Sequence, residues 1–258
     1  MEADRHCVEH RPAVPVAVGS ADLPPPPPAA AAVFGGRLAL AVRYAQLLVT
    51  DGIEHGLVGP READRIWDRH LLNCAVLAEL IPESARVVDV GSGAGLPGLV
   101  LACARADLRL QLVEPLERRV RFLDHAVGLL GLASQVEVIR GRADDRLVLK
   151  RSAGAEFVTS RAVAPLDRLA RWCRPLLAPG GRLLAMKGER AAVEIEAHRS
   201  ELARIGLPVQ ELALCGRGAL DDPARVVVLE RAAVGPRSRQ SSATRTARTR
   251  ETRRRNEQ

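Results

Sequence analysis

Four glycines and one aspartate in the stretch VVDVGSGAGLPG, residues 87–98, form the pattern with the clearest chemistry in the chain. Glycine lets the backbone adopt positive φ values and approach a ligand closely. The N-terminus of a helix that follows such a loop offers free N–H groups to the same ligand. The stretch therefore predicts a site for a phosphate or a nucleoside.

Two overlapping glycine patterns predict different ligands. Gly93, Gly95 and Gly98 match G-x-G-x-x-G, which is typical of dinucleotide-binding loops. Gly91, Gly93 and Gly95 follow Asp89 in an acidic-x-G-x-G-x-G pattern, which is typical of enzymes that bind S-adenosylmethionine. At this point both a nicotinamide-dependent oxidoreductase and a methyltransferase remain open.

Three features favour the second pattern. The expected strand 86–90 ends at Gly91, so the tight turn should begin there. The carboxylate of Asp89 suits a ligand with an ammonium group better than it suits a pyrophosphate. The chain also lacks the Tyr-x-x-x-Lys pair and the second substrate domain expected of a hydride-transfer enzyme.

Further candidates follow the next two expected strands. Glu114 ends the strand 108–114, where a carboxylate can accept hydrogen bonds from ribose hydroxyls. The alternative is an exposed acid that faces neighbouring arginines. Ala143 and Asp144 follow the strand 135–141, where an acid can meet an adenine amino group. The same acid could instead cap the next helix.

Basic residues provide candidates for contact with the methyl donor or with RNA. Arg161 ends the strand 155–162 and can bind donor or substrate through its planar guanidinium, or form a structural ion pair. Lys187 lies near the end of the strand 182–188, where it can meet an rRNA phosphate, or it is a solvated strand end. Arg69 and His70 lie on the expected helix 61–81, where His70 falls on the apolar stripe and could equally be a core histidine.

The elements that carry these residues alternate between strands and helices after two N-terminal helices. Apolar strands between helices predict a mostly parallel α/β sheet that is covered on both faces. A final antiparallel hairpin, 209–215 with 225–231, favours the seven-stranded, doubly wound Rossmann-like fold of class I methyltransferases. The other expected elements are helices 34–48, 61–81, 97–105, 116–131, 166–177 and 189–206 and strands 86–90, 108–114, 135–141, 155–162 and 182–188.

Composition predicts one folded domain with two disordered ends. The chain has 258 residues, of which 47% are hydrophobic and 27% charged. We expect a disordered Pro/Ala-rich leader at 1–33 and a folded domain at 34–234 that includes N-terminal helices at 34–81. The tail 235–258 has eight arginines and two glutamates, so it carries +6 of the net charge of +7. It either attracts nucleic acid without sequence preference or only aids solubility.

Several classes of protein and site do not fit the sequence. No uninterrupted apolar run reaches the roughly 18 residues of a membrane helix, and the N-terminus lacks a signal-peptide core. Five dispersed cysteines form no C-x-x-C pair, which indicates reduced thiols and argues against a metal site. A cytoplasmic protein without a membrane partner is expected.

Several motifs in order resemble one bacterial family. GLVGPRE…WDRHLLNC, VVDVGSGAGLPG, LVEPLERRVRFL, TSRAVAPL and MKGE are similar to segments of the 16S rRNA guanine-N7 methyltransferases. This family, RsmG, is also called glucose-inhibited division protein B. The resemblance runs from about residue 34 to 230, and the sequences of these motifs look actinobacterial. It implies a class I fold, S-adenosyl-L-methionine as donor, and one guanine in the decoding-region loop of 16S rRNA as target.

The resemblance also implies which residues contact the donor. The family's donor contacts fall on Gly91, Leu96, Ala143, Asp144 and Arg161, and the physical argument adds the acids at the first two strand ends. We expect a monomer that acts on 16S rRNA, on the small ribosomal subunit or on its precursor. An RNA-binding factor that has kept the fold without turnover is a third hypothesis.

The chemistry of guanine N7 is consistent with the absence of motifs for a catalytic base or a cysteine nucleophile. N7 carries an in-plane lone pair and no proton, so the enzyme mainly supplies positioning and electrostatics. The segment TSRAVAP lacks the Asn/Asp-Pro-Pro-aromatic set of amino-group methylases, and no cysteine is placed as a nucleophile. No catalytic base is therefore expected, and Arg161 is the candidate for positioning.

Overall fold

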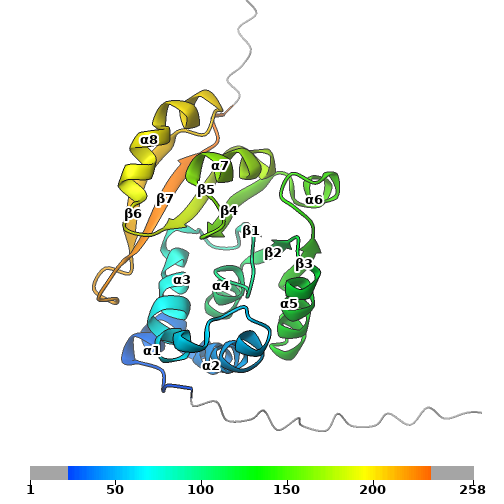
Figure 1. Ribbon diagram of the computed structural model, residues 1–258, viewed down its shortest axis with the longest axis vertical. Helices are drawn as coiled ribbons and strands as arrows, with labels where there is room; N and C mark the ends of the chain where they lie inside the picture. The colour runs from blue at the N-terminus through cyan, green and yellow to red at the C-terminus, as the bar shows by residue number, and fades with distance from the viewer. Residues whose placement is uncertain (1–22, 234–258) are drawn as a thin grey trace, which may run out of the picture.

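A single mixed sheet forms the centre of the protein. In the computed structural model, which describes residues 23–233, seven strands lie in the order β3-β2-β1-β4-β5-β7-β6 (Figure 1). β1 to β5 run parallel, and β7 pairs antiparallel with β5 and β6. This confirms the predicted doubly wound sheet with its terminal hairpin. The strands are β1 Arg86–Val90, β2 Arg109–Glu114, β3 Val136–Arg140, β4 Ala155–Arg161, β5 Leu177–Lys187, β6 Val209–Cys215 and β7 Ala224–Glu230.

Helices cover both faces of the sheet and enclose two cores (Figure 1). Successive strand residues point to opposite faces, so Val87 packs into one core and Val88 into the other. The first core holds the N-terminal helices with α4 and α5, and the second holds α6, α7 and α8. These helices are α4 Gly98–Ala104, α5 Glu117–Leu129, α6 Arg146–Ser152, α7 Leu166–Cys173 and α8 Ala191–Arg204.

An N-terminal helical layer completes the first core. It consists of α1 Pro28–Phe34, a short turn, α2 Leu38–Leu47 with its continuation η2 Leu48–Gly52, and one further helical run. That run comprises η3 Pro60–Arg65, η4 Ile66–Leu72, α3 Asn73–Ala75 and η5 Val76–Leu80. Pro60 occupies the first turn, because its fixed φ suits that position and its missing N–H is not needed there.

The boundary of the disordered leader, expected at residue 33, needs correction. Residues 28–33 are helical, because Ala30 and Phe34 of α1 are buried in the first core. The indole Nε1 of Trp67 also donates a hydrogen bond to the carbonyl of Pro24 over 2.8 Å. The leader residues 1–22 and the arginine-rich tail lie outside the described part of the chain.

The helical stretch Pro28–Gly52 is long and apolar enough to cross a membrane by length and composition. Tyr44 and Leu48 within it are nevertheless fully buried against the rest of the protein. The apolar spacing of Leu38, Val42, Ala45 and Leu48 predicts one packed face, on which Ala45 and Leu48 are buried and the other two are partly buried. Tyr44 joins this packed face, which makes the stretch a core layer of the domain.

Two elements differ from the expected boundaries. β5 begins at Leu177, so the segment APGG, which lies between the expected helix 166–177 and the expected strand 182–188, belongs to the strand. The pairing of β4 with β5 shifts in register between Ala155 and Phe157, which accommodates these extra residues. The short helix α6, which was not bounded from the sequence, follows the end of β3.

Candidate active site

The glycine loop begins where β1 ends. Gly91, Gly93 and Gly95 have φ values of +71°, +59° and +95°, which L side chains rarely adopt. Gly91 N–H donates to the carbonyl of Val113 over 2.8 Å, so the turn starts at Gly91 as expected. Gly98 is instead the first residue of α4. The positive-φ glycines thus coincide with the acidic-x-G-x-G-x-G pattern.

Tyr44 supports the loop from the N-terminal layer. Its hydroxyl donates a hydrogen bond to the carbonyl of Ala94 over 2.6 Å. A Cβ on Gly95 would lie 2.7 Å from that hydroxyl oxygen and 2.6 Å from Cδ1 of Leu99. Sequence reasoning did not find this residue, although it is the only tyrosine in the chain. The loop is therefore held in place by a residue about fifty positions earlier.

Asp89 is turned toward the protein interior. Its side chain is fully buried, and its two carboxylate oxygens accept hydrogen bonds from Thr159 Oγ1 and from the Gly98 N–H, each over 3.1 Å. A partner for a ligand's ammonium group was expected here. The burial and the internal donors instead make Asp89 a positioning residue that joins β1 to β4 and to the start of α4.

The burial of Asp89 makes stability depend on pH. Burial raises the pKa of this carboxyl from 3.8 to about 6, so the folded protein retains a proton that the unfolded chain has released. The resulting contribution to stability is full below about pH 4 and is lost as the pH rises through about 6. Across that window the pKa difference corresponds to about 3 kcal/mol.

Asp89→Asn is the matched comparison, because asparagine cannot titrate and still offers an acceptor to Gly98 N–H. We expect the free energy of unfolding of the wild type, minus that of Asp89→Asn, to fall by about 1.3 kcal/mol between pH 5 and pH 7. Urea unfolding at several pH values measures this difference, in which titrations common to both proteins cancel. A difference that does not vary with pH would contradict the prediction.

Glu114 lies at the end of β2 and contacts the glycine loop. Its side chain is 1% exposed, which excludes the alternative of an exposed acid. One carboxylate oxygen accepts a hydrogen bond from Gly93 N–H over 2.9 Å, and the other accepts one from Leu116 N–H over 3.1 Å. Nη1 of Arg119 lies 3.9 Å from Oε2 of Glu114. Nε of Arg119 is buried without a hydrogen-bond partner among the described residues. The carboxylate of Glu114, the guanidinium of Arg119 and the backbone of Gly93 therefore lie close together at the end of β2.

The residues predicted after β3 divide into a buried and an exposed group. Ala143 is buried, whereas Asp144 is exposed and lies 3.5 Å from Nε of Arg142. Asp145, not Asp144, immediately precedes α6, and its carboxylate accepts a hydrogen bond from Arg142 N–H over 2.7 Å. Leu96, in the glycine loop, is partly buried against the first core.

Arg161, at the end of β4, joins the sheet to the N-terminal layer. Nη1 donates to Sγ of Cys74 over 3.1 Å, and Nη2 donates to the carbonyl of Arg69 over 2.9 Å. Neither partner is a carboxylate, so the alternative of an ion pair does not apply. Beyond Arg161 the chain turns through Ala162, at φ +54°, and places Val163 over Gly91. The β4 end thus lies directly beside the glycine loop.

Arg69 and His70 share one acidic partner. Nε2 of His70 lies 2.9 Å from Oε2 of Glu62, and Nε of Arg69 lies 3.3 Å from the same oxygen. Burial lowers the pKa of His70, and its side chain is only 12% exposed. His70 therefore fits the alternative of a core histidine, whereas the half-exposed side chain of Arg69 remains accessible.

Lys187 is held by internal partners. Nζ donates to the carbonyl of Ala164 over 2.8 Å and lies 3.0 Å from Oε2 of Glu194, and the side chain is 11% exposed. The expected contact with an rRNA phosphate needs an accessible cation, so this geometry argues against it. Because Ala164 lies between β4 and α7, Lys187 fixes the loop that passes over Gly91.

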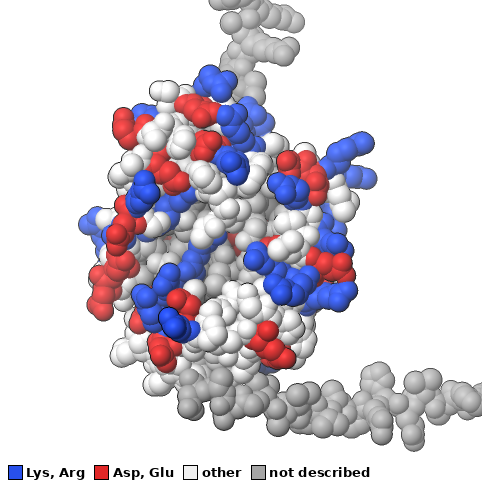
Figure 2. Space-filling model, viewed as in Figure 1, with Lys and Arg blue, Asp and Glu red and all other residues white. Residues whose placement is uncertain are grey.

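A cleft of about 740 Å³ opens beside Arg161. Its walls come from the start of α1, one face of the helical run Pro60–Leu80, the ends of β4 and β5, and the turn between β6 and β7. Figure 2 shows a hollow near the middle of the molecule, with basic and acidic side chains around it. Arg161 thus lines this cleft, and the loop that follows Arg161 passes over Gly91.

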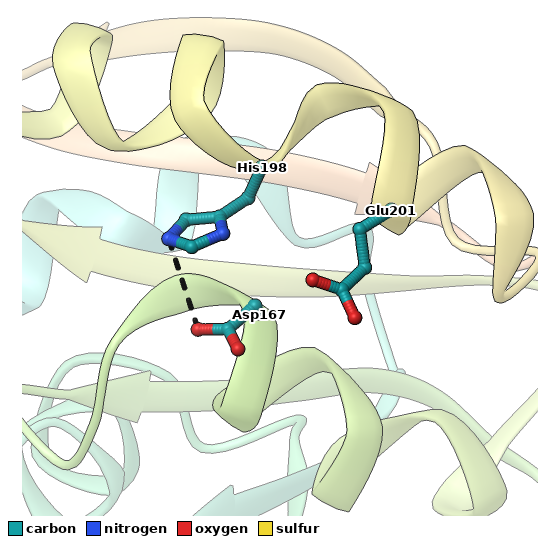
Figure 3. Close-up of side chains that lie close together, drawn as sticks. All are labelled: Asp167, His198 and Glu201. Atoms are coloured by element: carbon teal, nitrogen blue, oxygen red, sulfur yellow. Dashed lines mark ion pairs between the residues drawn. The ribbon is translucent and has the colours of Figure 1, made fainter.

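A second cluster of polar side chains joins α7 to α8. Asp167, His198 and Glu201 point toward one another (Figure 3), and Nε2 of His198 lies 3.8 Å from Oδ1 of Asp167. Their potential ligand atoms lie within 4.8 Å of one another. Glu201 is already paired with Arg171, and Arg204 lies 3.7 Å from it. Two guanidinium groups oppose a metal ion there, so the cluster is an ion-pair network between helices.

Comparison with known proteins places this geometry in a family. The family model described as rRNA small subunit methyltransferase G matches residues 37–221. The chain belongs to this family. Ribosomal RNA small subunit methyltransferase G of Salinispora arenicola is 54% identical over 90% of this chain and 97% of its own. The protein of the same name from Mycolicibacterium gilvum is 54% identical over 81% and 91% of the two chains.

A solved structure agrees with the fold of this methyltransferase G family member. Mitomycin 7-O-methyltransferase superposes with a TM-score of 0.51 at 20% identity, over 79% of this chain and 68% of its own. The match supports the class I methyltransferase fold alone. The region matched by the family model includes the glycine loop, Glu114 and Arg161, but it leaves out α1 and the Pro-rich segment before it.

Proposed function

We propose that this protein is an S-adenosyl-L-methionine-dependent methyltransferase that methylates N7 of one guanine in the decoding-region loop of 16S rRNA. The observation that carries the proposal is the contact of Glu114 with the glycine loop. Here a buried carboxylate at the end of β2 accepts a hydrogen bond from Gly93 N–H, and Gly93 is one of three positive-φ glycines that follow β1. Such a carboxylate can accept hydrogen bonds from ribose hydroxyls of a ligand that lies against the glycine backbone. Family membership supports the same activity.

The residues around the loop suit the donor's different parts. Backbone at Gly91, Gly93, Gly95 and Leu96 would line it, and Glu114 would hold its ribose. At the end of β3, Ala143 offers a buried backbone surface for the adenine ring and Asp144 an acceptor for its amino group. Arg161 would position donor and substrate, and Asp89 would keep the loop in place from behind. The bound donor would supply an electrophilic methyl group on a positively charged sulfur.

The transfer needs no base from the protein. The bound donor would supply its methyl group to the N7 lone pair of guanine and would keep the carbon–sulfur electron pair on its sulfur. The guanine gains a positive charge, and no proton moves. This chain's residues must therefore bind the base in line with the methyl group and exclude water. We assign this role to Arg161, which its hydrogen bonds to Cys74 and Arg69 hold at the end of β4, beside the cleft.

The experiment combines a binding measurement with a map of the modification. Purified protein should bind S-adenosylhomocysteine, the demethylated donor, and should not bind NADH with comparable affinity. It should transfer methyl groups to small-subunit particles or to 16S rRNA from a deletion strain, and the new mark should map to guanine N7 in the decoding-region loop. Persistence of that mark in the deletion strain would overturn the proposal.

The same assay defines the partner. We propose that the protein acts as a monomer in the cytoplasm on 16S rRNA within the small subunit or its precursor. Comparing methylation of free 16S rRNA with that of assembled 30S subunits decides which form is the substrate. Transfer to neither form, by protein that binds the donor, would overturn the rRNA assignment while leaving the methyltransferase assignment intact.

A further inference from the structure

One face of the helical run Pro60–Leu80 forms a wall of the cleft. Arg65, Asp68, Arg69, Leu72 and Asn73 all line it, so one side of this helical run faces the cleft. His70 is not among the lining residues. Since Arg161 bonds to the carbonyl of Arg69, this wall is fixed relative to the end of β4.

Asp68 is the one acid on this helical wall, and its carboxylate is available. It is exposed to the cleft and makes no hydrogen bond or ion pair with any residue in the described range 23–233. The neighbouring acid Glu62 is occupied by His70 and Arg69. Across the cleft, Asp222 is paired with Arg225, and the other two lining acids, Glu189 and Asp221, lie on turns after β5 and between β6 and β7. An acceptor on a rigid helical segment is better suited to recognition than one on a turn.

Guanine offers the matching donors. It is the base whose N1–H and 2-amino group lie side by side, so that one carboxylate can accept from both. This edge lies on the far side of the ring from N7. A guanine with N7 directed toward the glycine loop would therefore present N1 and the 2-amino group away from the loop, toward the cleft that Asp68 lines.

We propose that Asp68 recognises the target guanine by accepting hydrogen bonds from its N1–H and 2-amino group in the cleft beside Arg161. This inference rests on the proposed function, because it takes guanine N7 as the methyl acceptor. As N7 is methylated the ring becomes cationic and N1–H becomes a stronger donor. The hydrogen bond to the carboxylate then strengthens in the transition state, so Asp68 also contributes to the rate.

Asp68→Asn tests the proposal with Asp64→Asn as its matched control. Asp64 is an exposed acid on η3 that does not line the cleft. We expect Asp68→Asn to lower kcat/KM for methylation of 30S subunits by roughly 10- to 100-fold, the range for a bidentate base contact. Asp64→Asn should stay within about twofold of the wild type. Affinity for S-adenosylhomocysteine should be unchanged in both, since neither residue touches the glycine loop.

A modified substrate separates recognition of the base from a structural role. Small subunits reconstituted with inosine at the target lack only the 2-amino group there. The kcat/KM of wild-type protein should fall about tenfold on inosine. That of Asp68→Asn should show no further fall, because the partner of that amino group is already absent. Equal losses on inosine for both proteins, or equal activity of Asp68→Asn and Asp64→Asn on guanine, would overturn the inference. Wild-type protein that binds the donor but leaves guanine N7 unmethylated would overturn the proposed function itself.

Discussion

Gly95→Ala is expected to destabilise the protein by about 2–5 kcal/mol and to abolish donor binding. An alanine at φ +95° is strained by roughly 1–2 kcal/mol. Its Cβ would also lie 2.6 Å from Leu99 Cδ1 and 2.7 Å from the Tyr44 hydroxyl oxygen, and overpacking of this kind costs roughly 1–3 kcal/mol. Neither neighbour can move freely, because both are fully buried.

Gly93→Ala is the control that isolates backbone strain. Gly93 also has positive φ, at +59°, but the nearest atom to its Cβ position is the Gly91 carbonyl oxygen at 3.8 Å. We expect a cost of about 1 kcal/mol, from conformation alone. Urea unfolding measures both variants, and titration with S-adenosylhomocysteine measures the site. Equal destabilisation of the two variants would show that the contacts of Gly95 with Tyr44 and Leu99 are unimportant.

The strands and the glycine loop were predictable because their signals are local. RVVDV at 86–90 is a run of β-branched residues ahead of glycines, and the structure buries four of these five strand residues. The position of Glu114 followed from spacing along the chain, and its burial at the strand end agrees with the predicted place. Family motifs added the activity, which no single loop could have specified.

The internal partners of the site were not predictable because they are distant in sequence. Tyr44 meets Ala94 across 50 positions, and Arg161 meets Arg69 across 92. Lys187, at the end of β5, was a candidate for an rRNA contact or a solvated strand end, but its bonds to Ala164 and Glu194 depend on how α8 packs. Charge and position along the chain cannot distinguish an accessible cation from a paired one.

The same reason explains α1. A Pro/Ala-rich segment has little tendency to fold alone, so sequence reasoning assigned residues 28–33 to the leader. In the structure Ala30 and Phe34 are buried against the helical layer, and Trp67 holds the carbonyl of Pro24. Tertiary packing thus determines this helix and brings it to the edge of the cleft.

Glu114→Ala should reduce affinity for S-adenosylhomocysteine by more than about 100-fold. The carboxylate accepts hydrogen bonds from the Gly93 and Leu116 N–H groups and is the proposed acceptor for the ribose hydroxyls. Hydrogen bonds to a charged group contribute roughly 1.5–3 kcal/mol each. Losing two such hydrogen bonds between Glu114 and the ribose hydroxyls corresponds to at least a 100-fold loss of affinity, before any relaxation of the loop around Gly93. Isothermal titration of wild type and variant measures the ratio.

Glu117→Ala and Glu114→Gln make the result specific to the carboxylate. Glu117 lies on the exposed start of α5, where its partners are Arg121 and Arg140, and loss of such surface pairs costs less than about 1 kcal/mol. Its removal should leave donor affinity unchanged. Glu114→Gln keeps one acceptor oxygen, so its affinity for S-adenosylhomocysteine should lie between those of wild type and Glu114→Ala. If Glu114→Ala folds and still binds within threefold of wild type, Glu114 only supports the loop, and the ribose must be held by another group beside Gly93.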